Sequence, residues 1–149
     1  MIMDSKEFKN AFDIVAKSKG FEKAYGGWFK ESPECILVLD LQKSSFGDYY
    51  ELNIKVFVQG MFGTRYIKSK DLVKKDMGDI FTRQPNEFKD VLDFDITIED
   101  FTRKQRLEVL FNEFIVPFTE KVLTKNSIKE FAKRGELSLL PAVKLELGI

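Results

Sequence analysis

Hydrophobic residues near the start of the chain recur at the spacing of an amphipathic helix. Between Asp4 and Ser18 the apolar positions fall on one helical face: Phe8, Ala11, Phe12, Val15 and Ala16. Gly20 marks the end of this helix, because glycine readily takes the left-handed backbone that closes helices. Phe21 directly after it fits the hydrophobic contact that accompanies a glycine cap. The pattern predicts an N-terminal helix whose apolar face packs on the rest of the protein.

Three segments with the composition of strands follow this helix: Lys23–Glu31, Cys35–Ser44 and Tyr49–Val58. A four-residue turn at 45–48 pairs Ser44 with Tyr49 and fixes the register of the last two segments. One face is then wholly apolar and pairs Leu41 with Leu52, Leu39 with Ile54, Leu37 with Val56 and Cys35 with Val58. The opposite face, called the mixed face below, pairs Gln42 with Glu51, Asp40 with Asn53, Val38 with Lys55 and Ile36 with Phe57. We therefore expect a sheet with one core face and one partly polar face.

The side of the sheet on which Trp28 lies depends on the turn before Cys35. A three-residue turn at 32–34 pairs Glu31 with Cys35. It places Phe29 on the apolar face and Trp28 on the mixed face. A turn one residue longer would reverse both side chains, and we expect the shorter one.

Beyond residue 58 the pattern predicts further strands and then helices. A fourth strand is expected at Gly78–Arg83, and a candidate fifth at Val91–Ile96. A long helix opens at Thr97, and Pro117 should kink it near its end unless a new helix begins there. Two shorter helices are expected afterwards, one capped by Ser127 and closed by Gly135, the other within Leu139–Leu147.

Together these elements predict an α+β fold in a single domain spanning residues 1–149. An antiparallel sheet of four or five strands would carry the N-terminal helix and the long C-terminal helix on its apolar face.

Composition excludes several classes of chemistry. The chain has no histidine, so Ser-His-Asp catalysis, Cys-His catalysis and histidine metal sites are impossible. Cys35 is the only cysteine, which rules out an intrachain disulfide and favours a cytoplasmic protein. Basic and acidic residues are equal at 24 each, so no overall charge favours nucleic acid or a membrane surface. We expect neither a signal peptide nor a membrane anchor.

Three local features have simple structural explanations. The basic run from Lys68 to Lys75 is interrupted by Asp71 and is expected to be a solvated loop. The acidic cluster of Asp93, Asp95, Glu99 and Asp100 invites a divalent-cation site, but its spacing matches no calcium loop and its last two members suit a helix start. Gly26-Gly27 lies inside a predicted strand, which indicates a bulge or a close approach rather than a phosphate loop.

The mixed face holds the sharpest candidate site. It brings together donors, acceptors and an aromatic edge, and the candidate binding residues are Trp28, Asp40, Gln42, Ser44, Glu51 and Asn53. The simpler explanation, which stays open, is a half-solvated sheet face whose polar residues have no function.

Four short stretches of the first 60 residues carry a family resemblance. They are Gly20-Phe21-Glu22-Lys23, Gly27-Trp28-Phe29-Lys30-Glu31, Leu41-Gln42-Lys43-Ser44-Ser45, and Tyr50 with Asn53 ahead of an apolar strand. In these motifs the chain resembles the bacterial Domain of Unknown Function 4304 family. The resemblance supports the α+β fold and emphasises Gln42, Lys43, Ser44 and Asn53, but it implies no activity, because the family's function is unassigned.

The leading hypothesis is a cytosolic, non-catalytic binding module whose ligand, a small molecule or a protein, meets the mixed face. No cofactor is indicated, neither nucleic acid nor a membrane is expected as a partner, and the oligomeric state stays open. One alternative is a carboxylate-dependent, metal-assisted enzyme that uses Asp40 and Glu51 or the Asp93 cluster. Another is an immunity-type inhibitor of a partner protein.

Overall fold

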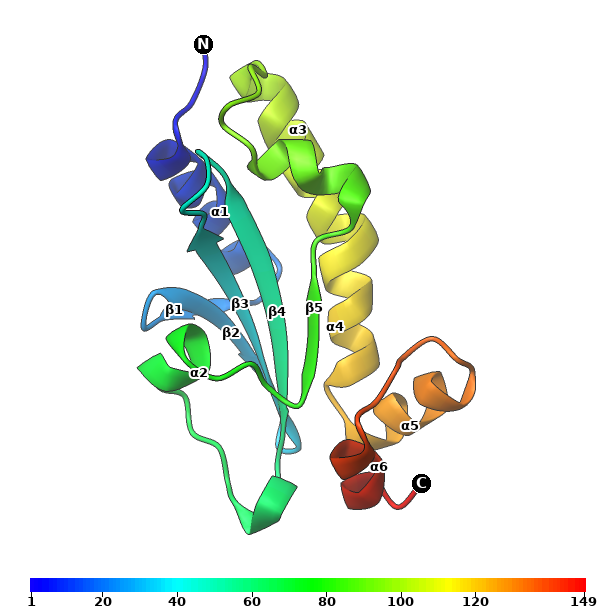
Figure 1. Cartoon of the computed structure of the whole chain (residues 1–149). Coiled ribbons are helices and arrows are strands. Elements are labelled where there is room, and N and C mark those ends of the chain that lie inside the picture. The colour runs from blue at the N-terminus through cyan, green and yellow to red at the C-terminus, as the bar shows by residue number, and fades with distance from the viewer.

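A single antiparallel sheet forms the centre of the computed structural model, which describes residues 1–149 (Figure 1). Its five strands follow one another in chain order: β1 (Glu22–Ala24), β2 (Gly27–Glu31), β3 (Cys35–Lys43), β4 (Tyr50–Val58) and β5 (Ile80–Arg83). The helices are α1 (Ser5–Ser18), α2 (Lys70–Lys74), α3 (Asp100–Leu110), α4 (Val116–Val122), α5 (Lys125–Lys133) and α6 (Pro141–Leu147). The α+β fold predicted from the sequence is confirmed. No helix has the length and apolar character needed to cross a lipid bilayer.

Helix α1 begins and ends as its sequence predicts. The Asp4 side chain accepts a hydrogen bond from the Glu7 backbone N–H at 2.8 Å, and the Glu7 side chain accepts one in return from the Asp4 N–H. At the other end Gly20 has φ +88°, and the Phe21 N–H donates back to Ala16 O at 3.0 Å. The chain then enters β1.

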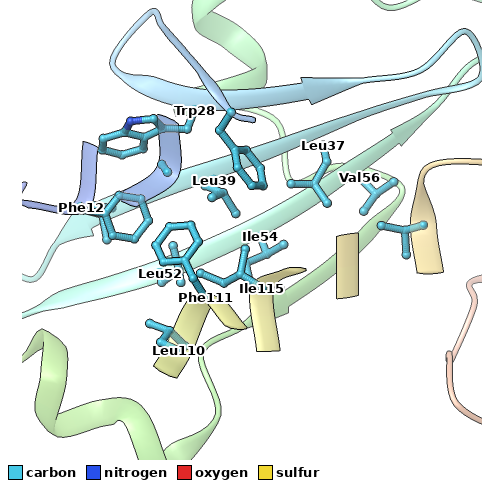
Figure 2. Close-up of a cluster of buried hydrophobic side chains, with 14 of the residues drawn as sticks. Phe12, Trp28, Leu37, Leu39, Leu52, Ile54, Val56, Leu110, Phe111 and Ile115 are labelled. Atoms are coloured by element: carbon cyan, nitrogen blue, oxygen red, sulfur yellow. The ribbon is translucent and has the colours of Figure 1, made fainter. Parts of the chain in front are cut away.

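The register predicted for the central hairpin is confirmed along its length. All nine pairs between β3 and β4, from Cys35–Val58 to Lys43–Tyr50, have the expected partners. The apolar face of these strands packs against α1, α3 and the turn after α3, and Figure 2 shows Leu39, Ile54, Phe12 and Phe111 in this core. In Figure 1 the run from α3 to α4 forms one long rod along the sheet, and α4 contacts β3. Alternating apolar side chains on both strands therefore define the buried side of the sheet.

The segment predicted as one strand over Lys23–Glu31 is instead a tight hairpin. Strands β1 and β2 pair antiparallel, and Tyr25 and Gly26 form the turn between them. Both turn residues have positive φ, 54° and 81°, as a two-residue hairpin turn requires. The bulge predicted for Gly26-Gly27 is therefore wrong, since Gly26 belongs to the turn itself, whereas the close approach predicted as its alternative occurs at Gly27.

Trp28 lies on the core face, contrary to prediction. Glu31 pairs with Ile36 rather than Cys35, so the turn is one residue longer than expected and the whole of β2 is reversed. The Ser32 hydroxyl stabilises this longer turn by accepting from the Glu34 and Cys35 N–H groups, both at 3.1 Å. Phe29 consequently faces the mixed side.

Residues 59–96 contain one predicted strand and three unpredicted helical segments: Met61–Gly63, α2 and Asn86–Leu92. Strand β5 confirms the expectation at Gly78–Arg83. The candidate fifth strand at Val91–Ile96 is wrong, because Asn86–Leu92 forms a 3-10 helix whose buried residues recur at helical spacing: Phe88, Val91 and Leu92. The sheet nevertheless has five strands, because the segment predicted as one strand over Lys23–Glu31 forms two, β1 and β2.

The C-terminal helices lie where the sequence places them, with different starting residues. Glu99, not Thr97, is the N-cap of α3, and Thr124, not Ser127, caps α5, since its hydroxyl accepts from the Ser127 N–H. The disturbance expected from Pro117 takes the form of a π-helical turn at Phe111–Ile115 rather than a break. Proline has no N–H to donate, and in an α-helix its ring clashes with the carbonyl group four residues earlier. A wider π-helical turn relieves this clash. Helix α6 ends at Gly148, with φ 74°.

Helix α2 covers part of the mixed face. Its Leu72 and Val73 are buried in a small second core with residues of three strands: Phe29, Ile36, Val38 and Phe57. Gly27 permits this packing, because a Cβ there would lie 2.9 Å from Val73 Cγ1 and 3.0 Å from the Leu39 carbonyl oxygen. Helix α2 does not cover the rest of the mixed face, which lies at the C-terminal end of β3 and the N-terminal end of β4.

Replacing Gly27 with alanine is expected to lower the free energy of unfolding by about 1 to 3 kcal/mol, because the new methyl group overpacks the contact between β2 and α2. Urea denaturation measures the loss. The double variant G27A/V73A should recover part of it, since Val73→Ala removes the clashing methyl groups. Strictly additive losses in the two single variants would contradict this explanation.

Candidate functional site

A hollow of about 530 Å³ lies on the uncovered part of the mixed face and extends round the edge of β3, where Leu41, Lys43 and Tyr50 of the other face also line it. Strands β3, β4 and β5 form its floor, and its walls come from α1 and from α2 with the loop after it. The lining residues are Lys9, Asp40, Leu41, Gln42, Lys43, Tyr50, Asn53, Lys55, Lys74, Lys75, Asp76, Met77, Phe81 and Arg83.

Asn53 is the centre of a hydrogen-bond network on the floor of the hollow. It is buried, and its amide nitrogen donates to Gln42 Oε1 at 2.9 Å and to Asp40 Oδ2 at 3.3 Å. Its amide oxygen accepts from Arg83 Nε at 2.9 Å. The terminal nitrogens of Arg83 make no hydrogen bond within the protein, so the network fixes a guanidinium whose donors remain free.

Two lysines connect the floor of the hollow to α2. The Lys74 ammonium lies 3.4 Å from Asp40 Oδ1. Lys55 is buried and donates to the carbonyl oxygens of Val73 at 2.7 Å and Leu72 at 3.4 Å, which holds the end of α2 on the sheet. Burial lowers the pKa of Lys55, although the nearby Asp40 and Asp76 charges oppose this change.

The hollow has a marked excess of positive charge. Six of its lining residues are basic and two are acidic, in a chain whose net charge is zero. Two of the cations are already paired, Lys74 with Asp40 and Lys43 with Asp48. Four others take part in no ion pair: Lys9, Lys55, Lys75 and Arg83. Burial lowers the pKa of Lys9, and the Lys74 and Lys23 charges lower it further, although the Asp40 charge opposes this change.

The structure brings together three of the six residues predicted for the site. Asp40, Gln42 and Asn53 share the network on the floor of the hollow. Glu51 and Ser44 line a second, adjacent hollow of about 410 Å³, where Glu51 accepts from Gln84 and the Ser44 hydroxyl accepts from the Phe46 N–H.

Trp28 does not belong to this group. It is fully buried on the opposite side of the sheet, and its indole N–H donates to Asp13 Oδ1 at 2.9 Å. Its placement on the mixed face followed from the predicted turn, and the longer turn removes it from the site.

Sequence reasoning missed most of the cations. Arg83 was recognisable in principle, because it lies in a predicted strand and pairs with Asn53. Lys74 and Lys75 belong to the basic run interpreted as a solvated loop, but α2 brings them to the edge of the hollow. Lys9 lies in a helix far away in the sequence, and no local pattern indicates that it meets β3.

Two of the four acidic residues in the cluster accept hydrogen bonds from backbone N–H groups. Asp93 Oδ1 accepts from the Asp95 N–H at 2.9 Å, and Asp95 Oδ2 accepts from the Asp48 N–H at 3.1 Å. Glu99 is the N-cap residue of α3 and pairs with the terminal amine of Met1. No group of three or more acidic or cysteine side chains is placed to hold a metal ion.

The fold and the hollow define an α+β protein with a cationic hollow on one face of an antiparallel sheet. A family model described as Domain of unknown function (DUF4304) matches residues 12–121, and the chain therefore belongs to this family. The matched region includes all five strands and every lining residue of the first hollow except Lys9. No curated protein and no solved structure matches the chain.

Proposed function

We propose that the protein is a non-catalytic binding module whose ligand is anionic and enters the hollow on the mixed face. The observation that carries this proposal is the excess of cations in the hollow, four of which have no ion-pair partner. Unpaired cations that converge from several elements repel one another, so an anion that neutralises them gains free energy on binding. We place the module in the bacterial cytoplasm, where an unpaired cysteine such as Cys35 stays reduced.

Arg83 is the residue best placed to contact such an anion. Its Nε is held by Asn53, its guanidinium lies 5.6 Å from the Phe81 ring centre, and its terminal nitrogens are free to donate. A guanidinium fixed in this way loses little conformational entropy when it binds a carboxylate or a phosphate. Lys9 and Lys75 add charge from two other elements of the fold.

Isothermal titration calorimetry with pyrophosphate and with citrate tests the proposal. Arg83→Met keeps much of the side-chain length and removes the charge, and it should weaken binding of the tighter of these anions at least about tenfold, since one charged hydrogen bond contributes about 1.5 to 3 kcal/mol. The control is Lys104→Met on the exposed surface of α3, which removes the same charge outside the hollow and should leave the affinity within about twofold.

The proposal fails if neither anion binds at millimolar concentration at low salt. It also fails if the Arg83 and Lys104 variants weaken binding equally, because the attraction would then come from general charge rather than from the hollow.

A further inference from the structure

An exposed aromatic ring stands at the tip of the β3–β4 hairpin, beside the cationic hollow. Phe46 is 94% exposed, although the loop that carries it is well held. The Ser44 N–H donates to Tyr49 O at 2.9 Å, the Ser44 hydroxyl accepts from the Phe46 N–H at 3.0 Å, and Lys43 pairs with Asp48. Phe46 therefore contributes no burial to the fold, yet its backbone is fixed.

Phe46 lines the second hollow, which adjoins the first. Gln42, Lys43 and Arg83 line both. The remaining lining of the second hollow includes the rings of Phe46 and Tyr49 and the hydroxyl groups of Ser44 and Ser45. We call the two adjoining hollows the groove. Lys9, Lys55, Lys74 and Lys75 line only its first hollow, whereas Phe46, Tyr49, the two serines and Glu51 line only its second, and Arg83 lines both.

We propose that this groove binds a nucleotide, with its phosphates in the cationic hollow and its base against Phe46. The inference rests on the anion site proposed above and names the class of ligand that the site takes. Phosphate groups carry more negative charge than a single carboxylate, which suits several unpaired cations in one hollow. A base is a flat ring that stacks on an aromatic side chain, and the serine hydroxyls and the Gln42 amide can donate to and accept from the sugar.

Calorimetry with ADP and with pyrophosphate separates the two ends of the groove. ADP should bind at least about fivefold more tightly than pyrophosphate, because one base stacked on an aromatic side chain contributes a factor of about five to a hundred. Phe46→Ala should remove this advantage and leave the affinity for pyrophosphate unchanged. Arg83→Met should weaken both ligands.

Phe101→Ala is the matched control, since Phe101 on α3 is 77% exposed and lies outside both hollows. It should alter neither affinity. Because Phe46 is almost fully exposed, the Phe46 variant should also melt at the same temperature as the parent protein.

Equal affinities for ADP and pyrophosphate, or an ADP affinity that Phe46→Ala does not change, would overturn the nucleotide inference while the anion site stands. Tighter binding of a short oligodeoxythymidine than of ADP would also overturn it, in favour of a single-strand site. Absence of pyrophosphate binding together with ADP binding that is insensitive to Arg83→Met would reject the anion site as well.

Discussion

Replacing Arg103 with alanine is expected to lower the free energy of unfolding by about 3 to 4 kcal/mol. Arg103 lies on α3 and is completely buried. Its guanidinium donates to three carbonyl oxygens in the segment before α3: Asp90 at 3.1 Å, Val91 at 2.6 Å and Ile96 at 3.0 Å. It also lies 4.7 Å from the centre of the Phe94 ring. Alanine would remove all three hydrogen bonds, leaving Asp90 O only its bond from the Asp93 N–H at 3.2 Å, and would create a cavity beneath the segment.

Arg103 has this large effect because it is a buried charge without an ion-pair partner. Burial lowers the pKa of Arg103, and the more distant charges of Asp90, Asp93 and Asp100 raise it only in part. The carbonyl oxygens therefore provide most of the compensation for the charge. A lysine at this position could not donate to three acceptors in the planar arrangement of a guanidinium, so Arg103→Lys should also destabilise the protein.

Urea denaturation of the two Arg103 variants measures these losses. The neighbouring residue supplies the control: Lys104 is exposed on the same helix, and Lys104→Ala should change stability by no more than about 0.5 kcal/mol. A loss of less than about 1 kcal/mol for Arg103→Ala would contradict the structural role described here. Removing a fully buried side chain together with three hydrogen bonds should destabilise the protein by more than that.

The sequence predicts the fold correctly where the apolar–polar alternations of two neighbouring strands must agree with each other. The alternation in β3 and the alternation in β4 agree in only one register, so their nine pairs follow from the turn at 45–48. Strand β2 has no such partner pattern, because each face of Gly27–Glu31 has one aromatic residue and one charged residue, so neither face is distinguished as the buried one. The side of the sheet on which Trp28 lies therefore depends on whether the turn has three or four residues, and no sequence pattern indicates the length of that turn.

The residues of the candidate site likewise fall into two groups, those that strand register predicts and those that it does not. Asp40, Gln42 and Asn53 could be placed together because they occupy strands of known register. Lys74 depends on α2, a five-residue helix too short to show a helical period, which docks through Leu72 and Val73. Lys9 depends on the position of α1 over the sheet edge. Such contacts arise from packing between elements distant in sequence, and local patterns do not encode them.

Trp28 offers a direct test of the corrected register, because the two faces predict opposite results for the same substitution. Trp28→Ala is expected to lower the free energy of unfolding by about 3 to 5 kcal/mol. The indole is fully buried, its ring centre lies 4.6 Å from that of Phe12, and Trp28 pairs with Leu39 in the centre of the sheet. Figure 2 shows it among the core side chains. On the mixed face, by contrast, its removal would mainly weaken a ligand contact.

Trp28→Phe allows both properties to be measured in a folded protein. It keeps an aromatic ring in the core and loses the hydrogen bond to Asp13, so it should cost about 1 to 2 kcal/mol in urea denaturation. Its affinity for pyrophosphate should equal that of the parent protein, because Trp28 is buried in the core and lines neither hollow. A variant with unchanged stability and weakened anion binding would return Trp28 to the mixed face and refute the register of β2.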